Sequence, residues 1–395
     1  MQKVELVDII EKPISGEWGE DDYVGNGKFV LRTTNFTNEG VINYSNVVTR
    51  AINKIHLENK YLRDGDILIE KSGGSDKQPV GRVVYFDGKP NTYLFNNFTS
   101  LLRVKEKKAS KRYVFYFLFY NYLNGKTRAF QNKTTGLHNL KLEPYLRSLK
   151  LLLPPIEEQK AIAEQLDKVS SLIEKRKQQF SVLDTLVKSK FVEMFGDPEI
   201  NPHRFKKVTI NDVCESIVRG PFGSSLKKEF FVEKGDKSYK VYEQKHAIQK
   251  SATIGTYYID ETKFKELSRF ECKAGDFLMS CSGTMGEIYQ LPENCERGII
   301  NQALCKFTLN KKITPVYFLV FMKQTIGKLE TKGSGIKNIA AVSYVKTMPV
   351  ILPPIGLQTQ FTAFVERVDN LKAKIKQSLS ALELLKKSLM QKYFG

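Results

Sequence analysis

Short loops rich in hydroxyl and cationic side chains are the parts of this 395-residue sequence that could do chemistry. The segment VRGPFGSSLKKEF sets glycines and a proline beside five such residues: Arg219, Ser224, Ser225, Lys227 and Lys228. Glycine lets a backbone approach a ligand closely, while these side chains hydrogen-bond to phosphate oxygens and base edges. Of the polar loops, this one is the better candidate for a binding surface.

Two other segments, GDILIEKSGGSDKQPVGRVVYF and GDFLMSCSGTMGEIYQL, each predict a strand, a glycine loop and a second strand. Their loop tips carry Lys71, Ser72, Ser75, Lys77 and Gln78 in the first, and Ser280, Ser282, Thr284 and Met285 in the second. Small polar side chains on such tips can reach base edges and phosphates. GD and SG pairs are also common in ordinary turns, so a purely structural role explains these loops equally well.

A third pair of segments, NKTTGLHNL and TKGSGIKNI, precedes two Leu-Pro-Pro-Ile motifs. The candidate residues are Lys133, Thr134, His138 and Asn139 in the first, and Lys332, Ser334, Lys337 and Asn338 in the second. They are candidates for a loop or helix start that faces nucleic acid, and a capped turn is an equally good interpretation.

Positive charge is spread over two blocks of similar size. Of the formal net charge of +19, residues 1–156 carry +8 and residues 197–355 carry +7. A polyanion is the natural partner of such blocks, because each neutralised phosphate releases condensed counterions. A basic chain that is merely soluble is the alternative.

The sequence also favours a reducing, aqueous location. Charged residues interrupt the first apolar positions, and the longest aromatic-apolar run, YVFYFLFY from Tyr113, is too short to span a bilayer. That run is interpreted as a buried helix. Five cysteines without a CxxC spacing argue against a disulfide framework or a zinc site. We therefore expect a cytoplasmic protein with no membrane partner and no metal of its own.

Catalytic motifs are absent from the sequence. There is no GxxxxGK[ST] phosphate loop, no [DNS]PP[YFW] tetrapeptide of amino-methyltransferases, no HExxH and no glycine fingerprint of a dinucleotide fold. A noncatalytic chain is therefore expected, while a DNA methyltransferase or nuclease with unfamiliar motifs and a structural coiled-coil scaffold stay open as alternatives.

The elements that position these loops occur twice. LLLPPIEEQKAIAEQLDK begins at Leu151 and VILPPIGLQTQFTAFVER begins 199 residues later, at Val350. Each opens a long helix, because proline is tolerated only in a helix's first turn, and Gly196 and Gly395 mark the ends. The chain thus reads as block, helix, block, helix, the signature of an internal duplication.

Both helices carry an apolar stripe with alternating spacings of four and three, which predicts a coiled-coil seam. The stripe residues are Ile162, Leu166, Val169, Ile173, Phe180, Leu183, Val187 and Met194, with Arg176 and Lys190 in its gaps, and Phe361, Val365, Val368, Ile375, Leu379, Leu382, Leu389 and Tyr393, with Lys372 and Lys386 in its gaps. Two copies related by a pseudo-two-fold axis would pack antiparallel. The helices would then act as a ruler between two basic blocks.

The repeated LPP-x-x-x-Q helix start, GPFGSSLK, and GD-x-L followed by SG resemble the specificity subunits of type I restriction-modification systems along the whole chain. The resemblance implies an α+β fold with mixed sheets: target-recognition domains at 1–152 and 197–351, and spacer helices at 153–196 and 352–395 that form an antiparallel coiled coil. It implies that each recognition domain reads one half of a gapped site in double-stranded DNA. It also implies two methyltransferase subunits and restriction-translocase subunits as partners, which would bind S-adenosylmethionine, ATP and Mg in place of this chain.

Overall fold

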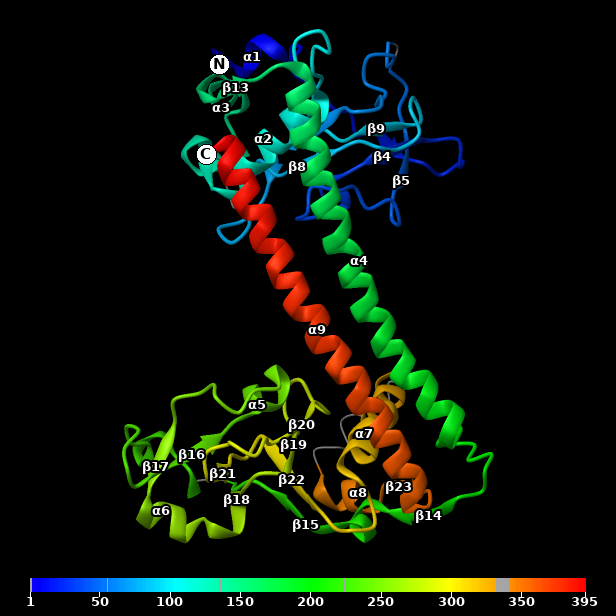
Figure 1. Cartoon of the computed structure of the whole chain (residues 1–395), viewed down its shortest axis with the longest axis vertical. Coiled ribbons are helices and arrows are strands. Elements are labelled where there is room, and N and C mark those ends of the chain that lie inside the picture. Colours follow the sequence, from blue (N-terminus) through cyan, green and yellow to red (C-terminus); the bar gives the residue numbers. More distant parts are fainter. Residues whose placement is uncertain (1, 55, 135–136, 223–224, 332–340) are drawn as a thin grey trace. The chain divides into compact units, whose positions relative to one another are not determined.

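The computed structural model describes residues 2–54, 56–134, 137–222, 225–331 and 341–395, and it contains both helices and sheets (Figure 1). The chain divides into two compact units: unit 1 is Met1–Lys177 with Gln377–Gly395, and unit 2 is Gln178–Lys376. Each unit therefore includes part of both long helices. The division into four consecutive segments is a different partition and stays a prediction.

Unit 1 is built on a four-stranded antiparallel sheet, called here the main sheet, in the order β2-β10-β6-β8. Its strands are β2 (Ile14–Ser15), β6 (Ile67–Glu70), β8 (Val83–Tyr85) and β10 (Thr99–Leu102). Helix α2 (Lys111–Leu123) packs on β8, and its aromatic residues from Tyr113 to Phe119 are buried in one core with Ile67 and Ile69. The interpretation of the aromatic run as a buried helix is confirmed.

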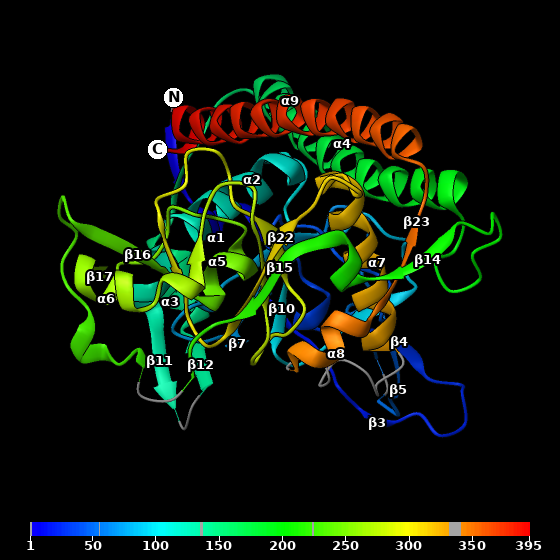
Figure 2. The same cartoon turned by 90° about the horizontal axis from the view of Figure 1, so that it is seen from below.

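Smaller elements complete unit 1. An outer sheet has the order β3-β5-β4-β9, a three-stranded sheet has the order β11-β12-β7, and β1 pairs with β13. Figure 2 shows β11 and β12 side by side as a hairpin. The bounds are β1 (Gln2–Glu5), β3 (Glu20–Asp21), β4 (Lys28–Leu31), β5 (Val48–Ala51), β7 (Ser72–Gly73), β9 (Tyr93–Phe95), β11 (Gln131–Thr134), β12 (Leu137–Leu140), β13 (Lys150–Leu153), α1 (Leu6–Ile9) and α3 (Leu142–Ser148), with 3-10 turns η1 (Thr33–Asn35) and η2 (Lys126–Phe130).

Unit 2 repeats the plan. Its main sheet has the order β15-β22-β19-β20, and its outer sheet, β17-β16-β21-β18, contains a parallel pair as the outer sheet of unit 1 does. The bounds are β14 (Lys206–Thr209), β15 (Cys214–Arg219), β16 (Ser238–Tyr242), β17 (Tyr258–Asp260), β18 (Glu271–Cys272), β19 (Phe277–Ser280), β20 (Ile288–Gln290), β21 (Gly298–Ile300), β22 (Leu304–Leu309), β23 (Pro349–Leu352), α5 (Gln244–Gln249), α6 (Glu261–Glu266), α7 (Pro315–Thr331) and α8 (Val342–Thr347), with 3-10 turns η3 (Ile210–Val213), η5 (Lys228–Phe230) and η6 (Ser268–Phe270). The two predicted strand-loop-strand segments are confirmed as β6-β8 and β19-β20.

The duplication is also visible in single hydrogen bonds. The Tyr113 hydroxyl donates to the Leu152 carbonyl at 3.0 Å, and the Tyr317 hydroxyl donates to the Ile351 carbonyl at 2.8 Å. In both units, therefore, a buried tyrosine ties the helix on the main sheet to the strand that precedes a long helix. The internal repeat predicted from the sequence is confirmed.

The long helices are α4 (Ile156–Phe195) and α9 (Ile355–Phe394), and both begin directly after the double prolines. Gly196 follows α4 with a φ of 73°, a left-handed conformation that ends a helix at little cost for glycine. In unit 2 the halves run antiparallel: Lys372 pairs with Asp184 at 2.6 Å, while Phe361 lies 5.4 Å from Phe195 between ring centroids. In unit 1 the late half of α9 packs on the early half of α4.

The predicted seam residues are buried or half-buried, and so are the four charged residues in its gaps. The stripe missed several buried residues near the helix ends, among them Phe191, Phe195 and Met390. Phe191 stacks on Tyr317 of α7 at 5.4 Å, so the buried face of the helix widens where it meets the core of its own unit. Within the described ranges, every helix is too short or too polar to span a bilayer.

Candidate nucleic-acid interface

In unit 1, three loops meet at the edge of the main sheet where β2 and β6 end and β10 begins. These strands are neighbours, because β10 pairs with both of the others. The backbone N–H groups of Lys71 and Ser72 donate to the Phe98 carbonyl at 2.8 and 3.2 Å. The loop after β6, which the sequence singled out, is therefore fixed beside the turn that precedes β10.

The β11–β12 hairpin joins this edge through β7. The Ser72 hydroxyl donates to Asn139 Oδ1 at 2.6 Å. The buried ring of His138 lies with Nδ1 3.2 Å from Gln131 Oε1 and Nε2 3.6 Å from Asp76 Oδ1. The structure thus brings together Ser72, His138 and Asn139, predicted from two separate motifs, and these contacts hold loop and hairpin together.

Two predicted lysines of this loop differ in environment. Lys71 Nζ donates to Ser15 Oγ at 2.8 Å, which ties the end of β6 to the end of β2. Burial, together with repulsion by Lys60, lowers the pKa of the Lys71 ammonium. Lys77 lies exposed at the loop tip. One cation therefore lies at the sheet edge and the other projects from the loop.

The same loop is braced by polar contacts that sequence reasoning missed. The predicted residues Ser75 and Gln78 make a turn, with the Gln78 N–H donating to Ser75 Oγ at 3.1 Å, and Gln78 Nε2 donating to Asn38 Oδ1 at 3.1 Å. Beneath the loop, burial raises the pKa of the Glu70 carboxyl to about 7 against the opposing effect of Arg82, whose Nε lies 3.4 Å away. The only available signal was the position of Glu70 at the last residue of a buried strand.

In unit 2, Arg219 lies at the equivalent edge of the main sheet, where β15 and β19 end and β22 begins. Its Nε donates to the Gln302 carbonyl at 2.9 Å and its Nη2 to the Cys281 carbonyl at 3.3 Å. Cys281 begins the loop after β19, and Gln302 lies in the turn before β22. The guanidinium therefore links the same three loops that meet in unit 1.

The loop that carries Thr284 is fixed by its backbone, so its side chains face outward. Gln244, from the start of α5, donates to the Ser282 carbonyl and, at 3.2 Å, to the Thr284 carbonyl. Ser280 Oγ donates to the Thr284 carbonyl at 2.6 Å. The side chains of Ser282 and Thr284 are exposed. Gln244 is a positioning residue for which no sequence motif gave a signal.

The loop after β15 carries three more predicted residues that the structure describes: Ser225, Lys227 and Lys228. The neighbouring Leu226 and Phe231 pack on the outer-sheet core, so this part of the loop follows the outer sheet. Lys227 and Lys228 are exposed, and Lys227 Nζ lies 3.6 Å from Glu229 Oε1. The structure therefore assigns them to a different part of unit 2 from Arg219.

Some of the predicted residues cannot be placed in this way. Ser224, Lys332, Ser334, Lys337 and Asn338 lie outside the described residues. Lys133 is described through its backbone, which lies in β11 opposite His138, and Thr134 lies opposite Leu137.

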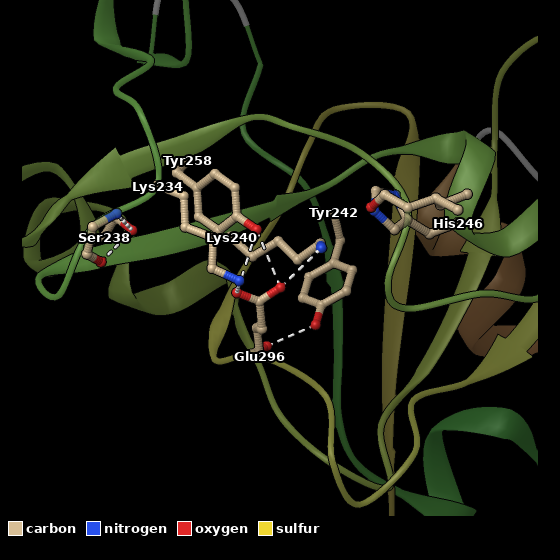
Figure 3. A network of polar contacts seen from close by, with 9 residues as sticks. Lys234, Ser238, Lys240, Tyr242, His246, Tyr258 and Glu296 are labelled. Atoms are coloured by element: carbon tan, nitrogen blue, oxygen red, sulfur yellow. Dashed lines mark hydrogen bonds and ion pairs between the residues drawn. The ribbon is translucent and has the colours of Figure 1, made fainter.

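An ion-pair network that includes the buried Lys240 braces the outer sheet of unit 2 (Figure 3). Lys240 Nζ, with a side chain only 1% exposed, lies 3.1 Å from Glu296 Oε1, and Lys234 Nζ lies 2.7 Å from Glu296 Oε2. The Tyr242 hydroxyl donates to the Glu296 carbonyl at 2.6 Å and the Tyr258 hydroxyl to its carboxylate at 3.1 Å. Burial alone would raise the pKa of Glu296, but the hydrogen bonds from both lysines outweigh it and lower that pKa. The network joins β16 and β17 to the segment before β21.

The same backbone contact, called here the frame, occurs at this sheet edge in both units: a glycine after one strand packs against the carbonyl of an asparagine. A Cβ on Gly16 would lie 2.2 Å from the Asn96 carbonyl oxygen, and a Cβ on Gly220 would lie 1.9 Å from the Asn301 carbonyl oxygen. Both asparagine N–H groups donate across to the outer sheet at 2.9 Å. Only glycine permits this approach, so the duplication has preserved the frame while the surrounding side chains differ. Among the described residues, no group of three or more His, Cys, Asp or Glu side chains is placed to hold a metal ion.

The sequence profile of the type I restriction modification DNA specificity domain matches the chain twice, at residues 1–180 and 202–383. The chain belongs to this family. The two matches fall on the two halves of the duplication, so the specificity domain is the repeated block.

Known members of the specificity-subunit family resemble the chain along most of its length. The EcoKI specificity subunit of Escherichia coli K12 is 23% identical over 95% of this chain and 82% of its own. The putative MjaX specificity subunit of Methanocaldococcus jannaschii is 24% identical over 82% of this chain and 76% of its own.

Solved structures share the fold. A chain from a structure on complex assembly and conformational transition of a type I restriction-modification system matches with a TM-score of 0.62 at 14% identity, covering 100% of this chain and 97% of that one. The S subunit from M. genitalium matches with a TM-score of 0.57 at 16% identity, covering 100% and 96%.

Proposed function

We propose that the chain is the noncatalytic, sequence-reading subunit of a type I restriction-modification complex, in which each unit reads one half of a bipartite, gapped site in double-stranded DNA. The observation that carries the proposal is the repeated frame at the main-sheet edge. Gly16 with Asn96 and Gly220 with Asn301 build the same loop geometry, yet Lys71 and Ser15 occupy one edge where Arg219 and Cys281 occupy the other. The two units share the same backbone geometry at this edge but carry different side chains there, which suits two domains that read different DNA sequences.

The net charge of +19 supports DNA as the partner. S-adenosylmethionine, ATP and Mg belong, in this proposal, to the methyltransferase and restriction-translocase subunits. A methyltransferase or nuclease activity of the isolated chain would contradict it. Incubation of the pure chain with labelled S-adenosylmethionine and DNA measures that activity directly.

Exchange of residues 197–352 for the equivalent block of a relative tests the two-reader proposal. Methylome sequencing of cells that carry the whole complex should show one half of the recognised motif changed and the other half kept. The reciprocal exchange of residues 1–152 is the matched control and should change the opposite half. If either exchange alters both halves, the units are not independent readers.

The long helices are proposed to form an antiparallel coiled coil that sets the gap between the half-sites and docks the methyltransferase subunits. Each unit exposes one leucine from each helix at positions that repeat with the 199-residue offset: Leu172 and Leu385 in unit 1, and Leu371 and Leu186 in unit 2. All four are between 43% and 50% exposed. Two matching pairs of exposed leucines fit two copies of one partner.

Native mass spectrometry of the complex tests this docking. Leu172→Asp with Leu385→Asp should reduce the methyltransferase content from two copies to one, because an apolar contact in one unit is replaced by charge. Val182→Asp is the control. Val182 is more exposed than these leucines, but the residue 199 positions later is Ala381, so this apolar position is not repeated in the second helix. Two retained copies in the double variant would show that these leucines do not dock the partner.

A further inference from the structure

Each unit presents one exposed phenylalanine at the loop-bearing edge of its main sheet. Phe98 directly precedes β10 in unit 1 and is 40% exposed, and Phe222 follows β15 in unit 2 and is 66% exposed. β2 and β10 are antiparallel neighbours, as are β15 and β22. The end of the first strand therefore lies beside the start of the second, and the two rings come from equivalent edges.

The two units obtain this ring from different loops. Two residues after the frame glycine, unit 1 has Trp18, whose ring is covered by the Arg50 guanidinium at 4.2 Å and packs against a small core of the outer sheet. Two residues after the frame asparagine, unit 1 has Phe98, where unit 2 has Ala303. Each edge therefore has one exposed ring. Unit 1 places it two residues after the frame asparagine, and unit 2 places it two residues after the frame glycine.

The backbone beside each ring is constrained by its surroundings. Pro221 restricts the backbone before Phe222, and Gly220 is packed against the Asn301 carbonyl. The carbonyl of Phe98 accepts the N–H groups of Lys71 and Ser72, which anchors it to the predicted DNA loop. A constrained backbone reduces the conformational freedom that each ring loses when it binds.

A cation accompanies each ring. The Arg219 guanidinium lies 5.4 Å from the Phe222 ring centroid and is oriented by two backbone carbonyls. In unit 1 the backbone N–H of Lys71 donates to the Phe98 carbonyl, and Lys71 Nζ donates to Ser15 at the same sheet edge. An aromatic face next to a cation suits nucleic acid, where a base offers a π-surface and the adjacent phosphate offers negative charge.

We propose that Phe98 and Phe222 are the aromatic base contacts of the two half-sites, each packing its ring against a base while the neighbouring Lys71 or Arg219 faces the phosphate backbone. The proposal rests on the proposed DNA-reading function and adds two specificity-determining residues to it. A ring packed between or against bases favours steps that unstack easily, so each phenylalanine selects sequence in its own half-site.

The test uses the full chain assembled with its methyltransferase subunits. Phe98→Ala and Phe222→Ala should each weaken binding to DNA that carries the bipartite motif by about tenfold or more, with a smaller effect on random DNA. The slope of log affinity against log salt should stay unchanged, because no charge is removed. In the methylome, Phe98→Ala should relax one half of the motif and Phe222→Ala the other.

Two matched controls separate this role from general surface effects. Phe29→Ala removes a ring that is 45% exposed on the outer sheet of unit 1, and Ile200→Ala removes an exposed side chain of unit 2. Both should leave affinity and motif unchanged. Phe222→Leu keeps an apolar side chain of similar size without a π-face, and its affinity should fall between those of the wild type and Phe222→Ala.

The outcomes distinguish this proposal from the DNA-reading function on which it rests. If the wild-type complex yields no bipartite motif, the DNA-reading function itself fails. If the wild-type motif is bipartite but both alanine variants reproduce it with unchanged affinity, the aromatic contact is wrong while the reading function stands. If an alanine variant melts at a lower temperature than the wild type, the Phe→Leu variant of that position, once shown to be folded, replaces it in the test. Full affinity and an unchanged motif in that leucine variant would overturn the proposal.

Discussion

The repeated spacing in LPP-x-x-x-Q has a structural meaning that a single substitution can test. Gln358 is fully buried, and its side-chain amide makes three hydrogen bonds: it accepts from the Thr314 N–H at 2.8 Å and donates to the Pro353 carbonyl at 2.9 Å and the Lys312 carbonyl at 3.2 Å. It therefore links the first turn of α9 to the start of α7. Gln159 does the same in unit 1 with two bonds, from the Ser110 N–H at 2.9 Å and to the Pro154 carbonyl at 2.8 Å.

Substitution by leucine keeps the volume and removes the bonds. Each lost hydrogen bond costs about 1 kcal/mol, and a buried N–H left without a partner adds about 1–3 kcal/mol. We therefore expect Gln358→Leu to lower the free energy of unfolding by about 4–6 kcal/mol and Gln159→Leu by about 3–5 kcal/mol. The difference between the two reflects the additional bond from Gln358 to Lys312.

Urea unfolding measures both values. The single tryptophan, Trp18, lies in unit 1, so its fluorescence reports that unit, whereas circular dichroism reports the whole chain. Gln159→Leu should shift the fluorescence transition to lower urea. Gln165→Leu is the matched control, because this exposed glutamine of the same helix accepts one bond, from the Tyr393 hydroxyl at 2.8 Å. If Gln159→Leu destabilises unit 1 no more than this control does, the buried amide does not anchor the helix.

Three further results are expected. Replacing Lys227 and Lys228 together by alanine should weaken binding to specific and random DNA alike and reduce the salt slope by up to about 2, measured by titration at several salt concentrations; an unchanged slope would exclude phosphate contacts. Because burial raises the pKa of Glu70 to about 7, the protonated carboxyl stabilises unit 1 fully below its ordinary pKa of 4.5, and this stabilisation is lost as the pH rises through 7. Glu70→Gln should flatten that decline in Trp18-monitored unfolding between pH 5 and 8, and a persistent slope would place its origin elsewhere. Inserting four helical residues between Lys177 and Gln178 adds about 6 Å of rise and a net rotation of about 40°, so the gap in the methylated motif should lengthen by about one or two base pairs with both half-sites kept; an unchanged gap would show that α4 does not set the spacing.

The sequence by itself determined the features that depend on local periodicity and on repetition. Double prolines and terminal glycines bounded α4 and α9, and the spacing of apolar residues gave the buried seam, because both signals act through neighbouring residues of one helix. The duplication could be detected in the sequence because some residues are the same in both copies. The loop glycines and the buried Gln159 and Gln358 cannot be replaced without a clash or an unpaired buried group.

Only the tertiary structure decided which residues of a loop face outward. Ser72, His138 and Asn139 looked like surface contacts from their types, but Ser72 bonds to Asn139, and the buried His138 ring lies against Gln131 and Asp76. Phe98 and Phe222 carried no signal as a pair, because the two units place the ring on different loops. Exposure and pairing depend on contacts between segments far apart in the chain, such as the end of β6 with the turn before β10, and no local pattern records those contacts.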